Sequence, residues 1–240
     1  MATLVPDGGA GTDRGGSTTD VIREKLRVLA GSALVGWIVA GLLGGIVGRL
    51  AMRLLVLTSD DRLDGAITDD EATVNQFTFG GSAGLFLFLA IAGIALAWLY
   101  VGARGSMPAS PRVRAAIWAA LVWSVAGSGV FEPDGFDFTQ LSPTWLAVLL
   151  FSAIFLAIGA LIALGVERAI TRWPERKLAL LPLGLVGPMF PVFAGGIVAV
   201  GGAALSDRYR AVRIFGAVVM AAILALIGLP TAANVIRILV

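Results

Sequence analysis

Cysteine and histidine are both absent from this chain of 240 residues. Without cysteine there is no disulfide, no thiolate nucleophile, no iron–sulfur cluster and no Cys-ligated zinc. Without histidine there is no His-ligated haem, zinc or copper and no Ser-His-Asp triad. The available chemistry is therefore that of carboxylates, arginine, tyrosine, hydroxyls and the backbone. We expect no metal and no other cofactor, and the sequence identifies no catalytic residue.

Charged residues are scarce as well. They make up 14% of the chain, against about 25% in soluble proteins, whereas hydrophobic residues make up 58%. The net charge of +2 is small, and no basic patch suited to nucleic acid is present. The composition is typical of a protein embedded in a lipid bilayer, and the bilayer is therefore the first partner that we expect, with no nucleic acid.

Long apolar runs predict an all-α fold, a polytopic helical membrane protein with about six transmembrane helices. The expected spans are 28–57, 79–101, 113–131, 144–166, 178–205 and 214–240. Together they form a single transmembrane helical bundle over residues 21–240. Trp98 and Tyr100 at one end of the second span, and Trp145 at the start of the fourth, are predicted to lie at the membrane interface. Pro230 is predicted to divide the sixth span.

The first 20 residues are rich in Gly, Ser and Thr and contain little that is apolar. Such a segment cannot bury enough surface to offset the entropy lost on ordering. It also lacks the basic region and apolar core of a secretory signal peptide. Residues 1–20 are therefore predicted to be a disordered cytoplasmic tail, with Asp20 as a candidate N-cap of the first helix.

The fifth span is interrupted by proline and glycine. Each proline removes a backbone donor and clashes with the carbonyl group four residues earlier, so the segment is predicted to be kinked or broken. Its candidate solute-lining or hinge residues are Pro182, Pro188, Pro191, Gly187 and Gly195.

The charges between the spans predict the topology. Lys and Arg gather before the first span and in the second and fourth gaps, whereas the first and third gaps are acidic. Cytoplasmic loops carry the Lys and Arg excess, so we expect a multi-pass protein of the cell membrane with a cytoplasmic N-terminus. The fifth gap, with Arg208, Arg210 and Arg213, is basic although a simple count places it outside. Either the fifth span is an ordinary kinked helix, or it re-enters and returns to the cytoplasmic side.

Polar residues gather at the predicted outer side of the bundle. Arg49 and Arg53 are four residues apart and share a helix face, where they repel each other unless an anion lies between them. A salt-bridged outer cluster is one hypothesis; in the other, the arginines extend to lipid phosphate and the acids form a solvated loop. The candidate members are Arg49, Arg53, Asn75, Glu132, Asp134 and Asp137.

Glycines recur at the spacing of helix contacts. Gly44 with Gly48, and Gly80 with Gly84, each lie four residues apart. Close backbone approach stabilises helix pairs in lipid, so these positions are predicted to be contact faces within the bundle.

Two classes of function remain open. The leading hypothesis is a non-enzymatic membrane protein, either a transporter-like carrier of a small or lipidic solute or a partner of another membrane component. That component is another membrane protein or a second copy of the chain. The alternative is an integral membrane enzyme that acts on a phosphate-bearing lipid through interfacial carboxylates and arginines. A carrier needs a polar site near the middle of the membrane, whereas this enzyme needs convergent carboxylates at the interface.

Overall fold

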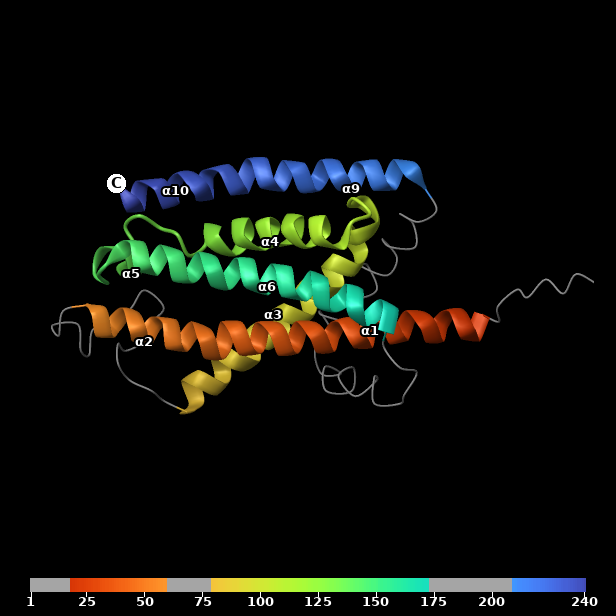
Figure 1. The fold of residues 1–240 in the computed structure, drawn as a ribbon, viewed down its shortest axis with the longest axis horizontal. Coiled ribbons are helices and arrows are strands. Elements are labelled where there is room, and N and C mark those ends of the chain that lie inside the picture. Colours follow the sequence, from red (N-terminus) through yellow and green to blue (C-terminus); the bar gives the residue numbers. More distant parts are fainter. Residues whose placement is uncertain (1–17, 60–78, 173–208) are drawn as a thin grey trace, which may run out of the picture.

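The fold is helical throughout the part of the chain that the computed structural model describes, residues 18–59, 79–172 and 209–240 (Figure 1). The expected all-α class is thereby confirmed. The first helix begins at Thr18, so Asp20 lies inside it rather than capping it. The remainder of the expected tail and the expected fifth span, 178–205, lie outside the described residues.

The described helices follow one another in a simple order. They are α1 (Thr18–Ala40), the π-helix η1 (Gly41–Val47), α2 (Gly48–Thr58), α3 (Phe79–Ala103), the 3-10 helix η3 (Arg104–Ser106), α4 (Pro111–Ser128), α5 (Phe136–Thr139), α6 (Thr144–Arg172), α9 (Arg210–Ile223), the π-helix η5 (Leu224–Gly228) and α10 (Leu229–Leu239). α1, η1 and α2 form one continuous rod, and α9, η5 and α10 form another.

Four helices within these ranges are long and apolar enough to cross a membrane: Glu24–Thr58, Ser82–Ser106, Thr144–Thr171 and Arg210–Leu239. The expected span 113–131 corresponds to α4, which has 18 residues and carries two arginines in its first turn. Such a helix is about 27 Å long, somewhat less than the hydrocarbon core of about 30 Å. The described part of the chain thus supports a membrane protein and does not confirm a count of six spans.

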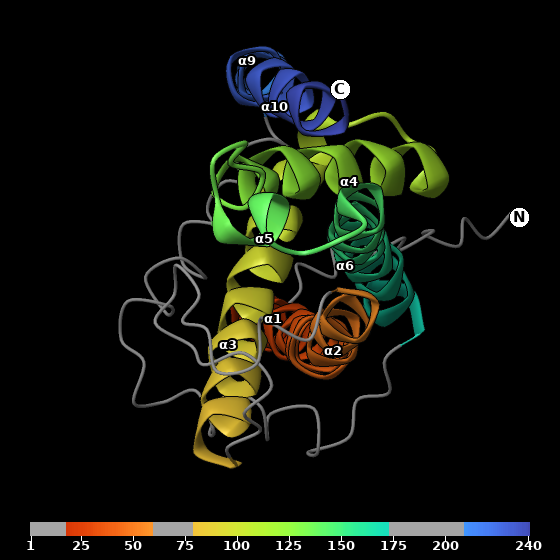
Figure 2. The same cartoon turned by 90° about the vertical axis from the view of Figure 1, so that its left-hand side faces the viewer.

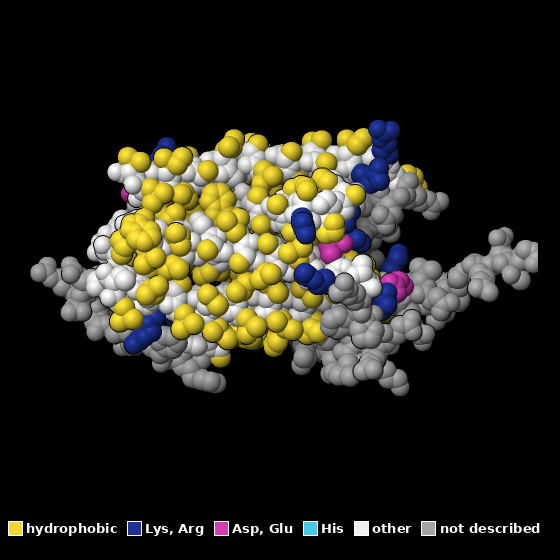
Figure 3. Space-filling view, in the orientation of Figure 1, with side chains coloured by type: hydrophobic (Ala, Val, Ile, Leu, Met, Phe, Trp, Pro, Cys, Tyr) yellow, Lys and Arg dark blue, Asp and Glu magenta, His cyan; other side chains and the backbone are white. Residues whose placement is uncertain are grey.

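The helices pack into an elongated bundle. The rod of α1, η1 and α2 lies on one side of the molecule, the rod of α9, η5 and α10 lies on the other, and α4 and α6 lie between them (Figures 1 and 2). α3 runs obliquely across the first rod. Hydrophobic side chains cover the middle of the face shown in Figure 3, and Lys and Arg side chains lie toward its two ends. An apolar band between charged ends is the surface that a bilayer requires.

α1 and α3 cross where two glycines meet. A Cβ atom added to Gly93 would overlap the carbonyl oxygen of Gly36, and a Cβ on Gly36 would overlap that of Gly93. Close backbone contact of this kind stabilises helix pairs in lipid, where there is no hydrophobic drive between helices. Of the glycines predicted as contacts, Gly44 does pack against Leu89 of α3, whereas a Cβ on Gly84 would meet no atom of the described residues within 4 Å. The described residues therefore supply no contact at Gly84, and the contact face predicted there stays a prediction.

The C-terminal rod is attached to α4 through small and hydroxyl-bearing residues. Thr231 is buried and donates to the carbonyl oxygens of Ser124 on α4 (3.2 Å) and of Ile227 on its own helix (2.8 Å). A Cβ on Gly228 would lie 2.6 Å from Ser124 Oγ, so this position must stay small. The predicted break at Pro230 is wrong: the helix continues to Leu239, because the wider π turn of η5 accommodates the missing donor and the ring.

α6 ends and α9 begins at the same end of the bundle (Figure 1). A Cβ on Gly216 of α9 would lie 2.8 Å from the Cβ of Ser106 in η3, which follows α3. In a simple alternation of six spans, the sixth span starts at the opposite end. Arg210 and Arg213 consequently lie at the same end as the basic residues near the start of α1, in η3 and at the end of α6. We call this the basic end of the bundle.

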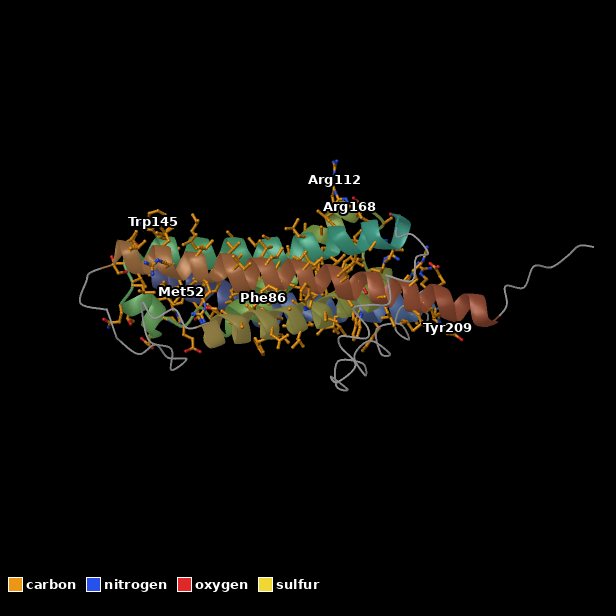
Figure 4. The ribbon with its side chains drawn as sticks, turned by 90° about the horizontal axis from the view of Figure 1, so that it is seen from below. Met52, Phe86, Arg112, Trp145, Arg168 and Tyr209 are labelled. Carbon is orange, nitrogen blue, oxygen red and sulfur yellow. The ribbon has the colours of Figure 1, made fainter. Side chains whose placement is uncertain are left out.

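Two aromatic residues near the basic end are buried. Trp98 and Tyr100 are 1% and 0% exposed, so they face neighbouring helices rather than lipid, and their position at the membrane interface stays a prediction. Trp98 donates its indole N–H to the carbonyl oxygen of Leu29 on α1 (3.0 Å), and the ring of Tyr100 packs edge-on against Trp118 of α4 with centroids 5.6 Å apart. Trp145 at the opposite end is exposed, as an interfacial residue should be (Figure 4).

Candidate functional site

Glu167 is an acidic residue near the end of the apolar helix α6. Its side chain is only 11% exposed. A carboxylate in such a position is costly unless it is paired and its oxygens accept hydrogen bonds. The side chains around Glu167 therefore determine the chemistry that is possible at this end of the bundle.

Three side chains from outside α6 donate to the Glu167 carboxylate. Tyr100 Oη donates to Oε1 at 2.8 Å. Arg104 donates from Nε to Oε1 at 3.2 Å and from Nη2 to Oε2 at 3.1 Å, which is a two-point contact. Arg114 donates from Nη1 to Oε1 at 3.0 Å. We call Tyr100, Arg104, Arg114 and Glu167 the Glu167 cluster.

Local structure explains why these groups converge. Tyr100 lies in the last turn of α3, and Arg104 begins η3, which continues from that helix; four residues apart, they lie on the same side of it. Arg114 lies in the first turn of α4, and its Nε donates to the carbonyl oxygen of Pro108 at 2.7 Å, which fixes the guanidinium. The cluster thus joins α3, α4 and α6 at the basic end.

The cluster carries an excess of positive charge and of donors. Two guanidinium groups face one carboxylate, and each guanidinium has five N–H donors, of which the described contacts use only part. Arg104 is 31% exposed and Arg114 is 15% exposed, so the cluster is open to the surface mainly on the Arg104 side. Chemically, the arrangement is suited to holding helices together and to attracting anions.

Two further arginines flank the cluster. Arg112 lies two residues before Arg114, and Arg168 directly follows Glu167. Both side chains are exposed, and among the described residues neither has a hydrogen-bond or ion-pair partner. They project from the same edge of the molecule (Figure 4), and the space-filling view shows basic side chains on either side of an acidic one over α4 and α6 (Figure 3).

The residues of the predicted outer cluster lie at the opposite end of the bundle. Arg49 is half-buried and Arg53 is exposed, both on α2, while Glu132 and Asp134 are exposed in the turn between α4 and α5. Asn75 and the Asp137 side chain lie outside the described part of the chain. A salt-bridged outer cluster therefore stays a prediction.

Apolar packing does bring α2 against the connection between α4 and α6. Leu55 is fully buried and clusters with Phe131, Phe138 and Leu141 of that connection. The backbone N–H of Ser142 donates to the hydroxyl of Ser59 at 2.8 Å. The arginines of the predicted outer cluster, on α2, and its acidic residues, between α4 and α6, thus lie on elements that contact each other.

The predicted solute-lining or hinge residues lie outside the described residues. These are Pro182, Pro188, Pro191, Gly187 and Gly195. Whether the segment 178–205 spans or re-enters the membrane is likewise outside what the structure describes.

Sequence reasoning missed the Glu167 cluster, although one signal was present. Glu167 is an acid in a mainly basic segment, at the end of a long apolar run. Ionisable groups in such positions require a partner, so its pairing with an arginine was predictable. The choice of Arg104 and Arg114 was not, because they lie 63 and 53 residues away.

The described residues contain no group of three or more acidic side chains close enough together to hold a metal ion. Comparison of the chain with protein-family models, with curated proteins and with solved structures finds no match. The geometry of the helices and of the Glu167 cluster is therefore what indicates a function.

Proposed function

We propose that this chain is a non-enzymatic integral membrane protein that binds another membrane component at the basic end of its helix bundle. The observation that carries the proposal is the Glu167 cluster. It fixes the ends of three helices in one position and leaves donors and positive charge at the surface. Fixed helix ends with an excess of cationic donors are suited to binding an anionic group.

The arrangement of carboxylates argues against the enzyme alternative. Both oxygens of Glu167 accept hydrogen bonds from arginine, so neither is directed at a substrate as a base or nucleophile. Glu132 and Asp134 are exposed on a turn, whereas an interfacial hydrolase needs convergent carboxylates in a walled site.

A carrier function is the second candidate, favoured by the π-helix η1. It occupies seven residues in the middle of the first long helix, and Gly41, Gly44 and Gly45 in it are buried. π-helical turns inside α-helices often mark functional sites. Transport of a solute by the chain reconstituted in sealed vesicles, lost on a Gly45→Leu substitution, would establish this second function.

The proposed function is tested with the purified full chain in lipid nanodiscs. The chain is incubated with phosphatidic acid and phosphatidylglycerol, and the lipids and any released phosphate are followed by phosphorus NMR. We expect no turnover. Turnover that disappears in a Glu132→Gln, Asp134→Asn double variant would refute the proposal and favour the enzyme that uses the outer acids.

A further inference from the structure

We propose that the phosphate group of an anionic lipid binds between Arg112 of α4 and Arg168 of α6, on the surface of the Glu167 cluster. This inference rests on the proposed function and names the chemical class of its ligand. Both arginines are exposed, neither has a partner among the described residues, and both project from one edge of the molecule (Figure 4).

The position of the two arginines along the bundle suits a lipid headgroup. Arg112 lies in the first turn of α4, and Arg168 lies in the last two turns of α6. The ion pair between Arg114 and Glu167 holds these two helix ends together at this level. Since α4 begins and α6 ends here, the arginines lie where the apolar surface gives way to the membrane interface. Basic sites between helices at a cytoplasmic interface bind anionic headgroups in this way.

The charges near the proposed site do not cancel. Arg104, Arg112, Arg114 and Arg168 carry four positive charges, and within the described part of the chain Glu167 supplies the only acidic side chain in contact with them. Glu167 is already held by Arg104 and Arg114, so it does not neutralise the two exposed arginines. A phosphate group accepts two parallel hydrogen bonds from a guanidinium and offsets the repulsion between the two charges.

The surface next to the arginines is apolar, which favours a lipid over a free anion. Leu161 and Leu164 lie seven and four residues before Arg168, on the same face of α6, and Ala116 lies four residues after Arg112 on α4. Leu161 is 45% exposed and Ala116 is also exposed. An acyl chain that descends from a phosphate at the arginines would therefore lie against apolar side chains.

The test uses native mass spectrometry of the full chain with added phosphatidylglycerol. The test variant is Arg112→Gln, Arg168→Gln. The matched control is Arg210→Gln, Arg213→Gln, which removes the same charge from exposed residues of α9 at the same end. We expect the test variant to lose about tenfold in lipid affinity, because it loses the bidentate contacts, and the control to lose less than about twofold. Equal losses in both variants would overturn the proposal, since they indicate only diffuse attraction.

Three additional measurements identify the ligand and control for misfolding of the variants. Phosphatidylcholine, whose choline compensates the phosphate charge, is expected to bind weakly, and inorganic phosphate is expected not to compete. Competition by inorganic phosphate would overturn the assignment to a lipid. The variant Arg112→Lys, Arg168→Lys keeps both charges and the fold, and it is expected to show an intermediate loss because lysine cannot form the two-point contact. Lipid turnover in the same samples would refute the proposed function instead, so the two failures are distinguishable.

Discussion

Arg104 and Glu167 form a two-point ion pair, with Nε and Nη2 of the guanidinium donating to the two oxygens of the carboxylate at 3.2 and 3.1 Å. The pair connects η3, which directly follows α3, to the end of α6, and Tyr100 and Arg114 donate to the same carboxylate. Because the carboxylate side chain is 11% exposed, its loss would leave two guanidinium groups without their main acceptor.

Replacing Glu167 with Gln is therefore expected to destabilise the protein strongly. Breaking a buried ion pair by removing one partner costs about 3–5 kcal/mol. The partial exposure of Arg104 lowers the expected loss in unfolding free energy here to about 2–3 kcal/mol. Unfolding of the purified chain in mixed micelles, followed by circular dichroism, measures it.

The matched control is Glu132→Gln, the same chemical change at an exposed turn position at the opposite end. We expect its effect to stay within about 0.5 kcal/mol, as for other surface substitutions. Equal stabilities of the two variants would show that the Glu167 cluster contributes nothing to the fold.

The crossing of α1 and α3 gives a second prediction. Gly93→Ala would place a methyl group against the carbonyl oxygen of Gly36, so α1 and α3 must separate and the protein should be destabilised by about 1–3 kcal/mol, the usual cost of overpacking. Gly84→Ala, on the same helix, meets no atom of the described ranges within 4 Å and is expected to be neutral or stabilising through helix propensity. Thermal unfolding of both variants in the same micelles compares them.

The position of α9 predicts a specific pattern of accessibility. The chain has no cysteine, so single cysteines can be labelled without background. Ser110→Cys, before α4, and Ala211→Cys, at the start of α9, should react with an impermeant thiol reagent from the same side of the membrane, and Glu132→Cys should react from the other. Labelling of Ala211→Cys and Glu132→Cys from the same side would restore the simple alternation of six spans.

The sequence predicts the helical class and the approximate limits of the long helices, because apolar runs of membrane length have few alternative structures. It fails where the structure depends on partners distant in the chain. Trp98 and Tyr100 are residue types that often anchor helices at the membrane interface. Here they are buried, because α1, α4 and α6 surround that end of α3. Glu167 carries a local signal, but its arginine partners depend on how three helices pack. The predicted break at Pro230 fails because a π turn accommodates the proline.

The contact between η3 and α9 provides a direct test of how the C-terminal rod is placed. A Cβ on Gly216 would lie 2.8 Å from the Cβ of Ser106, which is shorter than the Cβ separation of about 3.5–4.5 Å found in disulfides. We expect the double variant Ser106→Cys, Gly216→Cys to form a disulfide under mild oxidation after a small outward shift of α9. Both thiols should then lose reactivity toward a maleimide and regain it on reduction. In the control pair Ser128→Cys, Gly216→Cys, Ser128 lies at the end of α4 that is remote from η3, so the two cysteines should stay reactive. Persistent reactivity of the first pair would mean that α9 does not begin beside η3, and the assignment of Arg210 and Arg213 to the basic end would fail with it.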